Sequence, residues 1–288
     1  MADPTPEPEV SAEGRAPLAP VPLSQIENAS ADEAPSPWLG VNAIRFPAWT
    51  WWDAIVVFGI TVAAIFLCSL GALVLAQVIP SYRHLSVSTL AGDTYLVVGS
   101  QIAAYPLVIL AMALLVHGRT SEPFLIAIRW NWPHKAAAAF FLLGLILAFS
   151  IEGMARFLPI PKSLPMDKLF RDAPSAYLVA FFAITLAPLL EELFFRGLVY
   201  PLLRRAVSII PAVLLTAAAF AGIHGAQLGY AWAPILSIFV VGIVLTLVRE
   251  RTNSVAASFL THCGYNCTLF GLLWLASDHF QHLEKLTN

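Results

Sequence analysis

Residues 173–197 read APSAYLVAFFAITLAPLLEELFFRG, and this stretch decides what kind of fold the chain adopts. Its first part, Ala173–Leu190, is apolar and carries no charge. That length approaches the roughly 20 residues that an α-helix needs to cross the hydrocarbon core of a bilayer. The sequence therefore predicts a membrane-spanning helix here, which runs directly into two glutamates and, shortly after, an arginine.

Charge-free apolar runs of similar length follow one another along the rest of the chain. None of them shows the polar–apolar alternation of the strands in a membrane β-barrel. We predict an all-helical, polytopic transmembrane bundle of seven spans, or eight if one membrane-embedded segment is split. Basic residues are somewhat more numerous on the side of the N-terminus, which favours an N-terminus inside. The other six runs are Ala54–Ile79, Thr94–Val116, Ala136–Ile151, Ala206–Ile223, Ala231–Val248 and Ser254–Ser277.

The composition independently indicates an integral membrane protein. Of the 288 residues, 58% are hydrophobic and 12% are charged, whereas about 25% of the residues in an ordinary soluble domain are charged. The expected surroundings are therefore a lipid bilayer. The net charge of −2 gives no basic stripe for nucleic acid, so we expect no nucleic-acid partner.

The N-terminal segment differs from everything after it. Residues 1–40 hold eight prolines and seven acidic residues against the single Arg15, a composition typical of disorder. We predict a disordered acidic, Pro-rich tail over residues 1–40 and a transmembrane helical domain over residues 50–277. The tail lacks the basic start and apolar region of a secretory signal. We therefore expect the first span to insert the chain into a bacterial inner membrane, with an organellar membrane as the alternative.

The charges at the end of the run 173–190 are the most informative residues. An ionisable side chain at the bilayer centre costs about 2.5–3.5 kcal/mol on insertion scales, so Glu191, Glu192 and Arg196 are expected to face a protein interior or a wet cavity. Glu192 and Arg196 are four residues apart and can pair on one helix face. Glu191 lies about 100° around the helix from Glu192, so its carboxylate is free for chemistry. The alternative is a charge cluster that reaches the interface from a helix end.

Two later spans contribute further polar groups. His224 ends the run Ala206–Ile223, with Phe220 on the same helix face, and His262 and Asn266 lie one turn apart in the last span. Either histidine alone would more often be a packing residue than a functional one. Together with the glutamates, however, they give three membrane helices that each present polar chemistry inward, as in the sites of helical bundles.

These motifs resemble those of a known family. EExxxR at Glu191–Arg196, FxxxH at Phe220–His224 and HxxxN at His262–Asn266 occur in the order found in the CAAX-protease and bacteriocin-processing (CPBP, or Abi) family of intramembrane proteases. The resemblance covers residues 177–276, about a third of the chain. It implies a helical peptidase with its site inside the membrane, acting on a membrane-associated peptide or protein.

The resemblance also implies roles for the motif residues. Glu191 would activate the attacking water, with His224 orienting it, and His262 and Asn266 would stabilise the oxyanion. The second glutamate and the arginine of the first motif would shape the site. These roles agree with general chemistry, because an apolar cavity makes a carboxylate a better proton acceptor, and preorganised donors suit a developing oxyanion.

Participation of a metal is left open by the sequence. Glu191, His224 and His262 are acceptable zinc ligands, and zinc could activate the water, but the HExxH motif is absent. Cys263 and Cys267 lie one turn apart without a matching second pair, a poor zinc signature, and we interpret them as packing residues.

Two other functions compete with proteolysis. A non-catalytic membrane scaffold or immunity protein would keep the bundle and bind a partner, although it would not need two glutamates and two histidines within the membrane. A proton or ion carrier could use the same buried groups.

Overall fold

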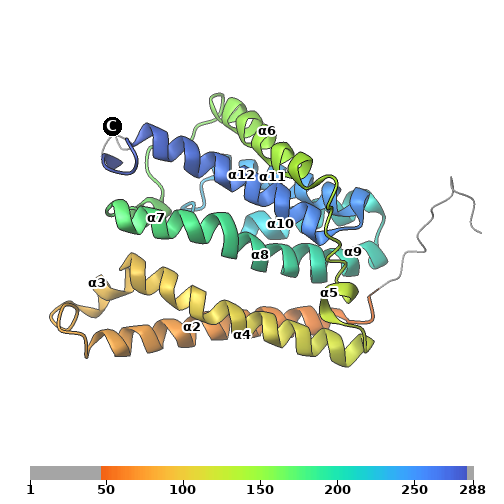
Figure 1. Ribbon diagram of the computed structural model, residues 1–288, viewed down its shortest axis with the longest axis horizontal. Helices are drawn as coiled ribbons and strands as arrows, with labels where there is room; N and C mark the ends of the chain where they lie inside the picture. Colours follow the sequence, from red (N-terminus) through yellow and green to blue (C-terminus); the bar gives the residue numbers. More distant parts are fainter. Residues whose placement is uncertain (1–46, 284–288) are drawn as a thin grey trace, which may run out of the picture. The chain divides into compact units, whose positions relative to one another are not determined.

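The computed structural model describes residues 47–283, so the predicted disordered tail over residues 1–40 lies outside the described residues. Within residues 47–283 the chain forms helices and no strand, which confirms the prediction of an all-helical fold (Figure 1). The α-helices are α2 (Trp51–Ala76), α3 (Val87–Ala91), α4 (Thr94–Thr120), α5 (Phe124–Ala127), α6 (Ala137–Ala155), α7 (Ala173–Phe181), α8 (Ala187–Glu192), α9 (Tyr200–Ala206), α10 (Ile209–Ile223), α11 (Trp232–Thr252) and α12 (Val255–Ala276). Three further turns are a 3₁₀ helix, η1 (Pro165–Leu169), and two π-helices, η2 (Phe182–Leu186) and η3 (Leu193–Val199).

Each of the seven predicted runs corresponds to a helix or a continuous series of helices. Within the described part of the chain, five are long and apolar enough to cross a membrane: α2, α4, α6, the series α7–α9 and α11. Five of the seven predicted spans therefore meet this criterion of length and composition in the described part of the chain. The helix α10 is shorter, at 15 residues, and α12 carries the polar residues of the HxxxN motif among its apolar ones.

The helix starts are encoded locally. Asp93 accepts hydrogen bonds from the first backbone N–H groups of α4, and Ser254 accepts one from Ala257 in α12. Asp172 caps α7 in the same way, because it accepts a hydrogen bond from the backbone N–H of Ser175. This hydrogen bond lowers the pKa of the Asp172 carboxyl below its usual range. Side-chain oxygens at these positions satisfy N–H groups that have no partner inside the helix.

Three pairs of helices make the principal contacts: α2 with α4, α6 with α12, and α10 with α11 (Figure 1). The α6–α12 pair is the closest, because glycines lie at the crossing. A Cβ on Gly264 would overlap the carbonyl oxygen of Phe141, and a Cβ on Gly144 would overlap that of Thr261. Small residues that let helix backbones approach are typical of packing in membranes.

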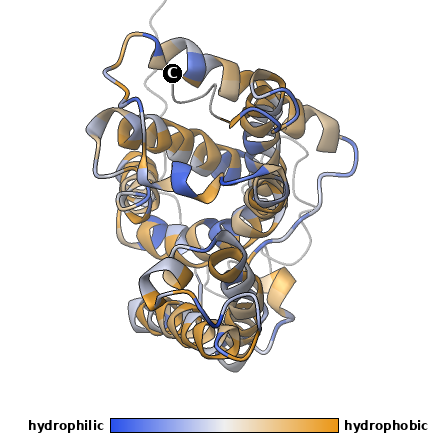
Figure 2. Ribbon diagram, turned by 90° about the vertical axis from the view of Figure 1, so that its left-hand side faces the viewer, coloured by the Kyte–Doolittle hydropathy of each residue, from blue (hydrophilic) through white to orange (hydrophobic). Residues whose placement is uncertain are grey.

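The outer surface is apolar, as expected for contact with lipid. Large hydrophobic side chains such as Trp52, Phe66 and Phe157 are 74%, 64% and 90% exposed. In Figure 2, hydrophobic colouring dominates the helices and hydrophilic residues concentrate in the connecting segments. An apolar surface of this kind identifies an integral, multi-pass membrane protein.

The series α7–η2–α8–η3–α9 spans residues 173–206 and carries the EExxxR motif. The Glu pair ends α8, a short α-helical segment with a π-helix on either side. Single-turn π-helices are rare and occur often at functional sites. This segment therefore departs from regular helix at the position where the sequence places its charges.

Candidate active site

The first element of the site is a buried polar network around Glu192. This side chain and that of Arg196 are both 0% exposed, and Arg196 Nη1 donates to Glu192 Oε1 over 2.8 Å. His262 Nδ1–H donates to the same oxygen over 3.0 Å, and the hydroxyl of Ser258 donates to Oε2 over 2.7 Å. The predicted pairing of Glu192 with Arg196 is thus present, and both carboxylate oxygens are occupied.

The other groups of Arg196 fix its position. Its Nη2 donates to the carbonyl oxygen of Gly242 in α11 over 3.0 Å, and its guanidinium carbon lies 4.5 Å from the centroid of the Phe220 ring. Its Nε is buried without a hydrogen-bond partner among the described residues. A guanidinium clamped between a carboxylate, a carbonyl and an aromatic face is a rigid structural group, since each contact restricts its rotation.

Glu191 occupies different surroundings, as its helix position predicts. Its Oε1 lies 3.9 Å from His224 Nε2 and its Oε2 lies 3.8 Å from His262 Nε2. Both separations exceed hydrogen-bond length, so the carboxylate faces two imidazole rings without bonding directly to either. With 19% of its side chain exposed, Glu191 is more accessible than Glu192.

Both histidines are oriented through the ring nitrogen that points away from Glu191. His224 Nδ1–H donates to the Phe220 carbonyl oxygen over 2.8 Å, and His262 Nδ1–H donates to Glu192. A carbonyl can only accept, so the Nδ1 of His224 carries a proton. The Nε2 of each ring is therefore the atom left to face Glu191.

Asn266 lies on α12 one turn beyond His262, but its amide is directed elsewhere. Its Nδ2 donates to the carbonyl oxygen of Ala183 in η2 over 2.6 Å. Among residues 47–283, no hydrogen bond joins Asn266 to either glutamate or either histidine. Of the six predicted site residues, five therefore form one continuous cluster, and Asn266 adjoins it through the backbone of the helix that carries the glutamates.

A cavity of about 190 Å³ opens onto Glu191 and His224. One wall comes from α2 and α4, with Phe58, Gln101 and Tyr105, and the other from the helices of the motifs. His262 does not line it. The cavity is mainly apolar and can take an aliphatic or aromatic group beside a carboxylate.

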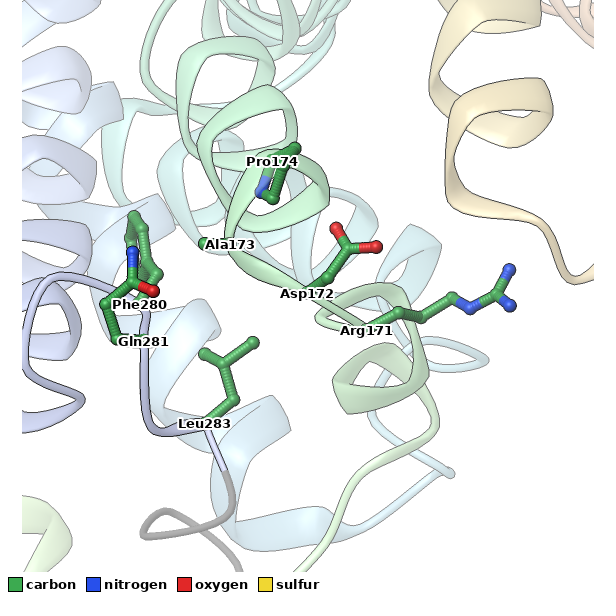
Figure 3. A pocket seen from close by; sticks show the side chains of 7 residues that line it. All are labelled: Arg171, Asp172, Ala173, Pro174, Phe280, Gln281 and Leu283. Atoms are coloured by element: carbon green, nitrogen blue, oxygen red, sulfur yellow. The ribbon is translucent and has the colours of Figure 1, made fainter.

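A second pocket, of about 410 Å³, lies where the start of α7 meets the C-terminal segment, and it contains none of the predicted site residues (Figure 3). Its basic and acidic groups already have partners, since Arg171 pairs with Asp93 over 2.8 Å and Asp172 caps α7. The lining residues are Arg171, Asp172, Ala173, Pro174, Phe280, Gln281 and Leu283.

The donor types around Glu191 suit zinc, and each histidine has the outer hydrogen-bond partner usual for a metal ligand. The spacing does not match, however. Ligands of a tetrahedral zinc stand about 3.3 Å apart, less than the 3.8 and 3.9 Å found here. In the described part of the chain, no group of three His, Cys, Asp or Glu side chains is arranged to hold a metal. We therefore derive no reaction step through a metal.

Sequence reasoning missed Ser258 and the cavity wall. Ser258 stands four residues before His262 and eight before Asn266, so the spacing SxxxHxxxN places all three on one face of α12. That spacing was a usable signal. Gln101 and Tyr105 carry no such signal, because they join the site only through the packing of α4.

Comparison with known proteins supports the resemblance drawn from the motifs. Residues 173–268 match the family model described as type II CAAX prenyl endopeptidase Rce1-like. No curated protein and no solved structure matches the chain. The matched segment includes all three motifs, with both glutamates, both histidines and Asn266. The resemblance is confirmed for residues 173–268, about a third of the chain, which are similar to the CAAX prenyl endopeptidases.

Proposed function

We propose that this protein is an intramembrane endopeptidase that hydrolyses a peptide bond in a membrane-associated peptide or protein, with Glu191 as the base that activates water. One observation carries the proposal. The Glu191 carboxylate lies at an apolar cavity between two oriented imidazole rings, at 3.9 and 3.8 Å from their Nε2 atoms.

The spacing between Glu191 and His224 suits one bridging water. A polar separation above 3.5 Å is the range in which a water bridges two groups, and Oε1 and Nε2 are 3.9 Å apart. Because the Nδ1–H of His224 is engaged by the Phe220 carbonyl, its Nε2 presents a lone pair when the ring is neutral. A water that donates one hydrogen to Glu191 and one to His224 turns its own lone pairs toward a substrate in the cavity.

The reaction then follows as a balanced sequence. Glu191 takes a proton from the water while the water oxygen bonds to the scissile carbonyl carbon, and the carbonyl oxygen becomes an oxyanion. Collapse of this intermediate breaks the C–N bond, and the proton held by Glu191 passes to the leaving nitrogen. The products are a carboxylic acid and an amine, and Glu191 returns to its starting state.

His262 and Asn266 are the proposed oxyanion donors. The Nδ1–H bond to Glu192 fixes the His262 ring with Nε2 toward Glu191, and in the imidazolium form this Nε2 carries the N–H donor. Asn266 donates one amide N–H to the Ala183 carbonyl, and its second amide N–H is the donor that we propose for the oxyanion. Donors fixed in this way need little reorganisation when charge develops.

The experiment is a cleavage assay with purified protein in lipid nanodiscs. A panel of prenylated and unprenylated peptides is tested with wild type, Glu191→Ala and Glu152→Gln, which alters an exposed carboxylate on α6. We expect wild type and Glu152→Gln to cleave and Glu191→Ala to be inactive. Equal cleavage by Glu191→Ala would contradict the proposal. Absence of any cleavage, combined with a partner that still binds a variant lacking both glutamates and both histidines, would favour the scaffold function.

A further inference from the structure

The two π-helices that flank the Glu pair end in the same unusual way. In η2, the N–H of Ala187 donates to the carbonyl of Phe182, five residues back, and the next residue is Pro188. In η3, the N–H of Tyr200 donates to the carbonyl of Phe195, and the next residue is Pro201. In both places, a proline follows the last i→i−5 hydrogen bond.

This arrangement leaves one carbonyl in each π-helix without a backbone donor. Continuing the i→i−5 pattern, Pro188 would donate to Ala183 and Pro201 to Arg196, but proline has no N–H. The donors four residues ahead, Ala187 and Tyr200, already bond elsewhere. The carbonyls of Ala183 and Arg196 therefore lie inside the helical series without a main-chain partner.

Each of these two carbonyls receives a side-chain donor from another helix. Asn266 Nδ2 of α12 donates to Ala183 over 2.6 Å, and Arg249 Nε of α11 donates to Arg196 over 3.2 Å. Arg249 is buried, at 6% exposure. Both π-helices leave one carbonyl without a backbone donor, and in both a side chain of another helix donates to that carbonyl. We therefore interpret the two hydrogen bonds as a consequence of the π-helices.

We propose that Arg249 is a positioning residue of the active site, which holds η3 in its π-helical form and thereby fixes Arg196. This inference rests on the proposed function of the Glu191 site. Arg249 holds the backbone of Arg196. The Arg196 guanidinium in turn bonds to Glu192, and Glu192 bonds to His262. Arg249 does not line the cavity, so it acts without touching the substrate.

Two variants separate the hydrogen bond from every other property of Arg249. The Nε2 of a glutamine occupies the place of the arginine Nε, so Arg249→Gln keeps an N–H donor there. Arg249→Met puts a methyl group at the same place and removes the donor. Both variants lose the charge and the bond from Nη1 to Asn253 over 2.8 Å. Any difference between them therefore reports the donor to Arg196.

A third variant supplies the missing donor from the backbone. Pro201→Ala restores an N–H that can satisfy the Arg196 carbonyl, so the double variant Pro201→Ala/Arg249→Met no longer needs the side chain. Arg251→Met is the matched control, because Arg251 is an exposed arginine of the same helix.

The experiment measures peptide cleavage and backbone hydrogen exchange over residues 193–206 in nanodiscs. For Arg249→Met we expect kcat to fall about 10- to 100-fold with KM within about twofold, since the pocket is untouched, and exchange in this segment to accelerate. Arg249→Gln, the double variant and Arg251→Met are expected to match wild type in both measurements. If Arg249→Met does not fold, folding of the double variant supports the inference and its failure overturns it.

Equal behaviour of Arg249→Met and Arg249→Gln in both measurements would also overturn the inference. The exchange measurement needs no substrate. Hydrogen exchange therefore tests the role of Arg249 even if wild type cleaves no peptide. Absence of cleavage would count against the proposed function and not against the role of Arg249.

Discussion

Replacing Gly264 by alanine tests how the contact between α6 and α12 supports the site. The added Cβ would lie 2.9 Å from the carbonyl carbon of Phe141 and would overlap its oxygen, whereas ordinary contacts begin at 3.4 Å. Both obstacles are backbone atoms, so the two helices must separate by about 1 Å. Overpacking of this kind costs about 1–3 kcal/mol.

The displacement of α12 is expected to lower the cleavage rate, because this helix carries His262 two residues before Gly264. A misplacement of about 1 Å costs about 100-fold in rate. Gly271→Ala is the control on the same helix, since a Cβ there meets nothing within 4 Å. It should keep wild-type activity, and the better helix propensity of alanine should leave the melting temperature equal or higher.

The assay combines thermal unfolding in nanodiscs with the peptide cleavage rate. We expect Gly264→Ala to unfold at a lower temperature and to lose most of its activity while Gly271→Ala does neither. Equal melting temperatures and equal cleavage rates for the two variants would contradict a close backbone contact between α6 and α12.

Three further predictions follow from the contacts of the site. Glu192→Gln is expected to destabilise the protein by about 3–5 kcal/mol, because it leaves the buried Arg196 charge unpaired; unfolding in denaturant measures this loss, and a change below about 1 kcal/mol would contradict a buried ion pair. Asn266→Leu leaves the Ala183 carbonyl without a donor and is expected to cost about 1–3 kcal/mol of stability as well as activity, whereas a purely catalytic asparagine would leave the unfolding midpoint unchanged. A chelator is expected to leave cleavage unchanged, since the site residues stand too far apart for tetrahedral zinc; loss of activity that returns on adding zinc would refute a metal-independent base.

Much of the fold could be predicted because hydropathy alone encodes it. Each charge-free run corresponds to helix, and the i,i+4 spacing of Glu192 and Arg196 correctly gave their ion pair. The different surroundings of Glu191 followed from its rotation around the helix. Such features depend on local periodicity, which a single sequence contains in full.

The π-helices could not be predicted from this sequence. Pro188 and Pro201 within an apolar run indicate a kink or an end of a helix, and nothing local indicates an i→i−5 pattern. The donors that satisfy the two carbonyls come from α11 and α12, 53 and 83 residues away. Arg249 in particular reads as an ordinary arginine near a helix end, so only the packing of the helices reveals its partner.

The span count illustrates a second limit. The charge-free runs Ala206–Ile223 and Ser254–Ser277 predict two spans, but a charge-free run does not fix where a helix begins or ends. In the first case the helix α10 begins only after Ser208 and has 15 residues. In the second case, the helix α12 carries polar residues of the site, such as His262, among its apolar ones. It packs against α6 and α11, and most residues of its first half are buried.

The kcat of Glu191→Gln on a peptide that wild type cleaves shows whether the Glu191 carboxylate is the base. This substitution keeps the size of the side chain and its place between His224 and His262, and it removes the ability to accept a proton from water. We expect kcat to fall about 100- to 10,000-fold with an unchanged melting temperature. A Glu191→Gln variant whose kcat stays within about twofold of wild type would contradict this role of Glu191.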